Sequence, residues 1–292
     1  RVVPLPVLIS GLAMGCIYAL VALGYVFIWN AMAIINFAQG EFLMFAAFLY
    51  VATFALRLRL GFGLSLLLTA AAMGILGAVF SRTVYSRLRR QSQLVAIIAT
   101  VGMGVFLKEA ARIVYGPEPF YISGPFGTRM VSVLGWAVPV QQLVIVGVAC
   151  GVMLLQQVLF HHSLAGRVMR AVAEDKETAS LMGVPVDTTL ALAFAYSAIL
   201  SAVAGVLMAP LFFITTEMGT MVGIKGFAAM IIGGFGSIPG AILGGVFLGI
   251  FENLGTFFIS STYKDAIAFL IMIAFLACRP QGIYAEPVTE RA

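Results

Sequence analysis

Residues 161–187 read HHSLAGRVMRAVAEDKETASLMGVPVD, and this polar stretch decides how the rest of the chain is arranged. Seven of its 27 residues are charged, whereas residues 130–166 and 188–216 contain no Asp, Glu, Lys or Arg. A charged stretch between two long uncharged runs predicts a segment in water that connects two membrane-spanning helices. The chain is therefore expected to fold in a lipid bilayer.

The composition indicates the same class. The 292 residues are 62% hydrophobic and 10% charged, with a mean hydropathy of +1.07, whereas soluble domains carry roughly 25% charged residues. The uncharged runs are too long, and alternate too little, for the strands of a membrane barrel. The sequence predicts an all-α integral membrane protein, a polytopic helical bundle of about eight or nine transmembrane segments in one domain, 1–292. The net charge of +5 lies largely in short loops and does not indicate nucleic-acid binding.

The stretch 161–187 contains the signals of a folded segment. Asp175 is expected to cap a short helix, Lys176–Met182, and Gly183 is expected to end it. Upstream, apolar residues at helical spacing favour a further turn or two over residues 166–173.

The short helix has one apolar side, which predicts a docking element. Ala179 and Met182 form this side, and Arg170 and Glu174 would lie on its rim. An apolar centre with a charged rim is typical of a surface that binds a partner protein. The alternative is a helix that rests on the membrane surface.

The other spans are expected at about 5–29, 42–56, 61–80, 94–107, 138–160, 188–214 and 266–278, with a kink at Pro210. The loop 81–93 contains Arg82, Arg87, Arg89 and Arg90 and no acid, which predicts that it is cytoplasmic. Counting the predicted membrane crossings from this loop places the N-terminus outside and the C-terminus inside. The same count places Lys225 among the exterior charges.

Residues 226–251, GFAAMIIGGFGSIPGAILGGVFLGIF, contain eight glycines. The first part, 226–236, would form only about 16 Å of helix, too short to cross a bilayer. We expect a broken or re-entrant helix here, followed by a full span, an arrangement that lines the path in transporters. Glycines spaced along one helix face predict close helix packing, and they occur at Gly11, Gly15, Gly147, Gly151, Gly240, Gly244 and Gly249.

Four polar or small residues between the first two spans form the candidate site. Asn36, Gln39, Gly40 and Glu41 lie within six positions. Because polar and charged groups are costly in hydrocarbon, we interpret them as part of a translocation path or its gate. The alternative is that Glu41 lies at the cytoplasmic interface and only caps the second helix. Glu252, which is followed by an asparagine, is expected to mark a helix end.

Several kinds of chemistry are not expected in this chain. No phosphate-binding G-x4-G-K-[ST] motif occurs, so the chain is not expected to hydrolyse ATP. His161 and His162 are adjacent and cannot share a helix face, which argues against a metal site. The three cysteines lie in apolar runs without pairing or metal spacing. The sequence predicts no catalytic residue, metal or cofactor here.

Three blocks of this sequence carry a resemblance to a known family. They are residues 11–42, from GLAMGCIYALVALGYVFIWN to INFAQGEF; residues 166–184, GRVMRAVAEDKETASLMGV; and residues 226–253, GFAAMIIGGFGSIPGAILGGVFLGIFEN, with the later RPQG at 279–282. Together they span most of the chain. The chain resembles the LivH-type permeases of the LivH/LivM family, which serve ATP-binding-cassette (ABC) importers of branched-chain amino acids.

The resemblance implies a multi-pass permease in the bacterial inner membrane, with a single permease domain, 1–292. It implies four further components: a LivM-like second permease, two ATP-binding subunits that hold ATP and Mg, and a periplasmic substrate-binding protein. Residues 161–187 would be the cytoplasmic coupling segment, with Ala171, Asp175, Ala179 and Gly183 at the recurring positions of the family.

Two questions stay open at this point. The family also includes importers of other amino acids, amides, urea and aromatic acids, so the substrate is not fixed by the sequence. A self-sufficient secondary transporter or channel for a small polar solute is the alternative function. Such a protein would have no use for a docking helix, so residues 161–187 distinguish the two classes.

Overall fold

The computed structural model describes residues 4–88 and 93–284. In chain order its helices are α1 (Leu5–Met32), α2 (Gln39–Phe48) with a π-helical continuation η1 (Leu49–Arg57), α3 (Phe62–Phe80) with η2 (Ser81–Tyr85) and α4 (Ser86–Leu88), α5 (Gln93–Tyr115), α6 (Val140–His162), α7 (Leu164–Glu174), α8 (Lys176–Leu181), α9 (Val186–Met208), α10 (Met218–Gly233), α11 (Ile238–Phe258) with the 3-10 turn η3 (Ser261–Tyr263), and α12 (Lys264–Cys278).

Within these residues, eight helical segments are long and apolar enough to cross a membrane. The helix α10 is apolar but shorter, with 16 residues. The predicted polytopic helical bundle is confirmed, and so is a short glycine-containing helix before a full span. In the loop between α5 and α6, the strands β1 (Met130–Val133) and β2 (Trp136–Pro139) pair as an antiparallel hairpin.

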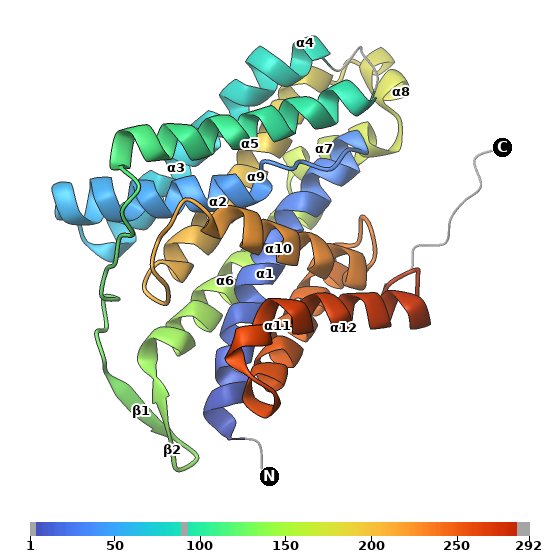
Figure 1. Cartoon of the computed structure of the whole chain (residues 1–292). Helices are drawn as coiled ribbons and strands as arrows, with labels where there is room; N and C mark the ends of the chain where they lie inside the picture. Colours follow the sequence, from blue (N-terminus) through green and yellow to red (C-terminus); the bar gives the residue numbers. More distant parts are fainter. Residues whose placement is uncertain (1–3, 89–92, 285–292) are drawn as a thin grey trace.

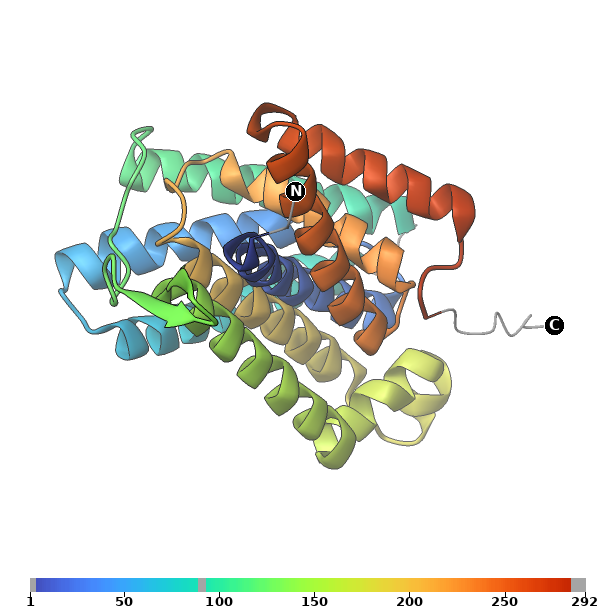
Figure 2. The same cartoon turned by 90° about the horizontal axis from the view of Figure 1, so that it is seen from below.

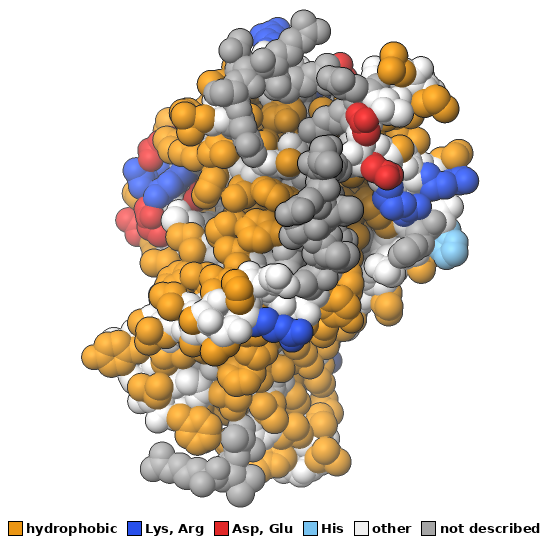
Figure 3. All heavy atoms as spheres, turned by 90° about the vertical axis from the view of Figure 1, so that its right-hand side faces the viewer, with side chains coloured by type: hydrophobic (Ala, Val, Ile, Leu, Met, Phe, Trp, Pro, Cys, Tyr) orange, Lys and Arg blue, Asp and Glu red, His pale blue; other side chains and the backbone are white. Residues whose placement is uncertain are grey.

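Helix α1 runs through the middle of the bundle, as Figure 2 shows. Between Gly11 and Ile28 all of its residues except Leu12 are buried. A helix that is apolar on every side is stable only when neighbours surround it, and α6, α9, α10 and α11 all contact it. The face in Figure 3 is covered mostly by hydrophobic side chains, as expected for a surface in contact with lipid or another membrane subunit.

The two polar segments that the sequence assigns to one side of the membrane lie at one end of the bundle. Figure 1 shows α4 and α8 at this end, and the start of α1 and the β1–β2 hairpin at the opposite end. We call them the α8 end and the hairpin end. Arg89 and Arg90 of the predicted cytoplasmic loop lie outside the described residues.

Three predicted boundaries are wrong. Helix α5 continues past residue 107 to Tyr115, since Lys108 and Arg112 find acidic partners and need not leave the helix. Helix α9 ends at Met208, so Pro210 follows the helix end and makes no kink. The short helix α10 begins at Met218 and ends at Gly233, where Gly234 has a φ of 107° that favours glycine.

Candidate functional site

The break between α1 and α2 places the four candidate residues inside the protein. At the end of α1, Ala33 has a left-handed backbone and its N–H donates to the carbonyl of Trp29. The Asn36 side chain then accepts from the N–H of Ala38 at 3.1 Å, which forms the turn that starts α2. Because Asn36 is completely buried, α2 begins within the bundle and not at its surface.

Gln39 joins three helices through its side-chain amide. The amide nitrogen donates to the hydroxyl of Ser201 on α9 at 2.7 Å, and the amide oxygen accepts from the hydroxyl of Ser197 at 2.7 Å and from Asn36 at 3.3 Å. Gly24 of α1 lies against this amide, where any Cβ would collide with it. The hydrogen-bond capacity of Gln39 is therefore used within the protein, and the geometry gives Gln39 and Asn36 a structural role.

Gly40 allows α2 and α10 to cross at close range. A Cβ built at Gly40 would collide with the carbonyl oxygen of Gly219 and lie 2.8 Å from the Cα of Gly223. Only hydrogen fits between these backbones, so a side chain here would push α10 away from α2. The position of α10 is thus determined by a glycine contact next to Glu41.

Glu41 differs from its neighbours because its bonding is incomplete. The residue is 8% exposed, and its Oε1 accepts from the hydroxyl of Thr220 on α10 at 2.8 Å. Its Oε2 is buried and has no hydrogen-bond partner among the residues that the structure describes. Glu41 lies in the first turn of α2, as the capping alternative requires, and its side chain is buried against α5 and α10.

Towards the hairpin end, an ion-pair cluster continues from this site. Lys108 Nζ of α5 lies 2.6 Å from Glu217 Oε2, and Arg112 lies 3.8 Å from the other oxygen of Glu217. The Glu217 side chain is 64% exposed, so this cluster is largely in reach of solvent. Polar groups therefore extend from the surface near the start of α10 to the buried carboxylate of Glu41.

A second buried charge cluster was missed by sequence reasoning. Lys225, in the middle of α10, is 4% exposed and lies 2.7 Å from Glu252 Oε1 on α11 and 2.6 Å from Asp265 on α12. Glu252 is completely buried and lies well before the end of α11, so its assignment to a helix end is wrong, as is the exterior position of Lys225. The signal was present: a single lysine in an apolar helix needs an acidic partner, and Glu252 is the acid in the next span.

The predicted glycine contacts fall into two groups. Gly11 and Gly15 of α1 pack on the backbone of α11, where Gly249 approaches Gly15, while Gly240 and Gly244 of α11 approach the backbone of α10. These glycines hold α1, α10 and α11 together. Gly147 and Gly151 of α6 face open space instead, with no atom within 4 Å of a built Cβ in the described structure.

The segment 161–187 forms two helices at the α8 end. The Ser163 side chain accepts from the N–H of Gly166 at the start of α7, and Asp175 accepts from the N–H of Thr178 at the start of α8, as predicted. Gly183, with a φ of 82°, follows α8. Asp175 and Gly183 therefore act as the cap and the stop of this helix.

The direction of the apolar side of α8 differs from the prediction. Ala179 is 6% exposed and packs inside the chain, with Val172 of α7, in a cluster that also contains Ile28 of α1. Met182 is 80% exposed and Leu181 88% exposed. A six-residue helix has too few turns for its pattern to show which side faces inward. The apolar atoms that a partner would meet belong to Leu181 and Met182, and Ala171 is also exposed.

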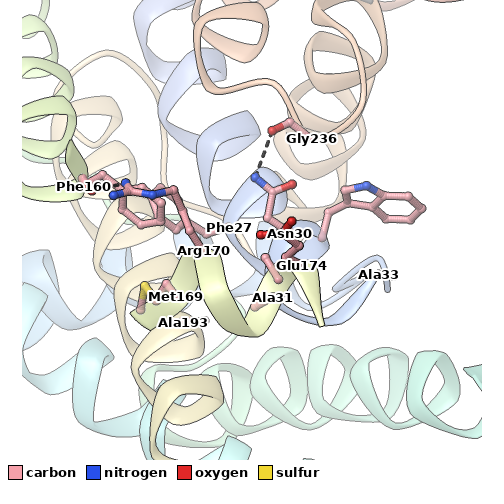
Figure 4. A pocket seen from close by; sticks show the side chains of 12 residues that line it. Phe27, Asn30, Ala31, Ala33, Phe160, Met169, Arg170, Glu174, Ala193 and Gly236 are labelled. Carbon is pink, nitrogen blue, oxygen red and sulfur yellow. Dashed lines mark hydrogen bonds between the residues drawn. The ribbon is translucent and has the colours of Figure 1, made fainter. Parts of the chain in front are cut away.

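A cavity of about 560 Å³ separates α7 from the α8 end of α1 and from the turn between α10 and α11. Figure 4 shows Arg170 on its wall, where the guanidinium donates to the carbonyl of Phe160, and Glu174 on the same helix. On the opposite wall Asn30 donates to the carbonyl of Gly236 at 2.9 Å. Helix α7 is thus packed against α1 only over part of its length.

Comparison with known proteins places this architecture in a family. Residues 7–276 match the sequence model of a protein family, which is described as "Branched-chain amino acid transport system / permease component". The permease protein LivH of the high-affinity branched-chain amino acid transport system of Salmonella typhimurium is 34% identical, over 97% of this chain and 96% of LivH. The corresponding BraD protein of Pseudomonas aeruginosa is 35% identical, over 97% of this chain and 96% of BraD.

A solved structure shares the fold. This chain superposes on a chain of the solved structure "PsaBC from Streptococcus pneumoniae in complex with Fab". The TM-score is 0.51 and the sequence identity is 14%, over 94% of this chain and 92% of that chain. The helical membrane architecture, the match over nearly the whole sequence and the relatives of equal length agree. This chain belongs to the family of permease components of branched-chain amino acid transport systems.

Proposed function

We propose that this chain is the inner-membrane permease subunit of an ABC importer for branched-chain or related amino acids. It forms the translocation path together with a second, homologous permease, and separate ATPase subunits supply the energy. A periplasmic binding protein delivers the substrate at the hairpin end. The whole chain, 1–292, acts as one permease domain.

The observation that carries this proposal is the pair of helices α7 and α8. Leu181 and Met182 are almost fully exposed at the tip of a folded, capped segment. Two neighbouring large apolar side chains exposed on a folded segment at the end of a membrane protein are typical of a surface that a partner covers. An ATPase subunit is the partner that a permease of this family requires, whereas a self-sufficient transporter has no use for such a tip.

The cavity beside α7 supports a coupling role for the same segment. Helix α7 contacts α1, α6, α8 and α9, but a helix with an open space beside it can shift as a rigid body at a lower cost than one packed along its whole length. Motion of α7 would reach the end of α1 and the turn between α10 and α11, since these form the other wall of the cavity. In this way closure of the ATPase subunits changes the position of α10 next to Glu41.

Co-purification from native membranes tests the proposed function. We expect two ATPase chains and a second permease to accompany this chain. A cysteine at Ser180, which is exposed on α8, should be labelled from the cytoplasm. A cysteine at Ser123, which is exposed in the loop before β1, should be labelled from the outside. Purification of the chain alone or with copies of itself, in a form that transports amino acids without ATP, would favour a secondary transporter.

A further inference from the structure

Glu41 Oε2 is one of the buried polar atoms that lack a hydrogen-bond partner in the described structure, and it belongs to the candidate site. Its partner oxygen is bonded to Thr220, whereas Oε2 is buried without a donor among the described residues. A buried carboxylate oxygen that lacks a donor costs free energy. Such a group is retained where a ligand supplies the missing donor at some stage of the working cycle.

Two glycines keep the surroundings of this oxygen free of side chains. A Cβ at Gly219 of α10 would lie 2.5 Å from Glu41 Oε2, and a Cβ at Gly104 of α5 would lie 3.3 Å from Glu41 Cγ. Any larger residue at either position would cover the carboxylate. At these two positions α10 and α5 present backbone to Glu41, while the Thr220 side chain of α10 reaches only the other carboxylate oxygen.

A cation lies one helical turn from Gly104 on α5. Lys108 follows Gly104 by four residues, which places it on the same helix face about 6 Å further towards the hairpin end. Its ammonium contacts Glu217 and has three N–H donors, so it can bind a second carboxylate at the same time. The carboxylate of α2 thus lies beside Gly104 of α5, and the ammonium of Lys108 follows one turn further along α5.

We propose that Glu41 and Lys108 form a subsite for a zwitterionic amino acid on the translocation path. The ammonium group of the amino acid donates to Glu41 Oε2, and its carboxylate binds Lys108. The inference rests on the proposed function and adds the chemistry by which this chain recognises its substrate. A ligand with only one of the two charges would leave one of the two residues unpaired, which disfavours it.

Transport stoichiometry in proteoliposomes tests this subsite. The complex is reconstituted with its second permease, ATPase subunits and binding protein, and L-leucine uptake per ATP hydrolysed is measured. Glu41→Gln keeps the shape and the bond to Thr220 but removes the charge, while Glu41→Asp keeps the charge. The matched control is Glu109→Gln, which neutralises an exposed carboxylate on α5 whose side chain is 49% exposed.

We expect Glu41→Gln to lower L-leucine uptake per ATP by about tenfold, corresponding to about 1.4 kcal/mol, with ATP hydrolysis within about twofold of the unmodified complex. Glu41→Asp should retain more of the uptake, and Glu109→Gln should change neither quantity. Gly104→Ala, which keeps the charge but places a methyl group 3.3 Å from Glu41 Cγ, should also lower uptake per ATP. This variant tests the subsite even where Glu41→Gln does not assemble.

Two results would overturn the subsite while leaving the proposed function intact. One is unchanged uptake per ATP in both Glu41→Gln and Gly104→Ala. The other is a parallel fall of uptake and ATP hydrolysis, which would identify Glu41 as part of a gate that does not contact substrate. Failure of the unmodified complex to take up any amino acid would instead refute the proposed function.

Discussion

Replacement of Lys225 by methionine removes the nearer of two cations beside a completely buried carboxylate. Lys225 Nζ lies 2.7 Å from Glu252 Oε1, a distance at which two unit charges attract by about 6 kcal/mol at an effective dielectric constant of about 20. The full amount is not lost, because Lys264 Nζ lies 3.4 Å from the same oxygen and stays in place. Removing one partner of a buried ion pair costs about 3–5 kcal/mol, so we expect a loss of stability of about 3–4 kcal/mol.

The double variant Lys225→Met/Glu252→Gln separates charge from shape. It contains neither buried charge, and Asp265 remains solvated because its side chain is 51% exposed. We expect it to recover most of the stability lost in Lys225→Met. Lys264→Met is the matched control, since Lys264 lies 3.4 Å from the same Glu252 oxygen but is 26% exposed. Its effect should be below about 1 kcal/mol.

Thermal unfolding of the detergent-solubilised complex, followed by size-exclusion chromatography with fluorescence detection, measures these differences. Lys225→Met should lower Tm by roughly 5–10 °C, with the double variant and Lys264→Met close to the unmodified protein. A double variant as unstable as Lys225→Met would show that the lysine acts through packing on Tyr18, whose ring lies 5.8 Å from Nζ, and not through its charge. An unchanged Tm in Lys225→Met would refute the ion-pair argument.

Three further predictions concern the docking tip, a glycine contact and the amide network. Leu181→Asp should abolish ATPase association by placing a charge in the interface. Leu134→Asp is the control, because Leu134 is equally exposed at 88% but lies at the hairpin end, and it should bind the ATPase subunits normally. If a pull-down recovers the ATPase subunits equally well with both variants, the docking assignment is wrong. Gly244→Leu should prevent recovery of folded protein, because its Cβ would meet the carbonyl of Ala229. Gly147→Leu should be tolerated, because Gly147 faces open space. Similar yields of folded protein from the two variants would contradict this prediction. Gln39→Leu should cost about 1–3 kcal/mol by removing the buried amide hydrogen bonds to Ser197, Ser201 and Asn36. A Tm equal to that of the unmodified protein would show that the network is dispensable.

The sequence was sufficient for the class of protein and for most of its helices. Long uncharged runs show where helices cross a bilayer, because charge there is costly. The cap at Asp175 and the stop at Gly183 are local interactions between near neighbours in the chain, and they were found for that reason. Glycine spacing identified the contacts of α1, α10 and α11 in the same way.

What the sequence could not provide is the position of a residue relative to distant helices. Gly147 has the spacing of a packing glycine, yet no part of the described chain lies against it. Lys225 was read as an exterior charge because the partners that bury it are 27 and 40 positions away, at Glu252 and Asp265. Ala179 was assigned to the side that meets a partner and is instead buried within the chain, since a helix of six residues is too short for its apolar pattern to show which side faces inward.

ATP-dependent uptake of L-leucine into proteoliposomes tests the central claim most directly. The chain is reconstituted with its second permease and ATPase subunits, and labelled L-leucine is offered with the binding protein on the side of Ser123. The account predicts accumulation that requires both ATP on the side of Ser180 and the binding protein, and that is lost with Leu181→Asp. Accumulation without ATP, or unaltered uptake in Leu181→Asp, would contradict an ATPase-driven permease coupled through α8.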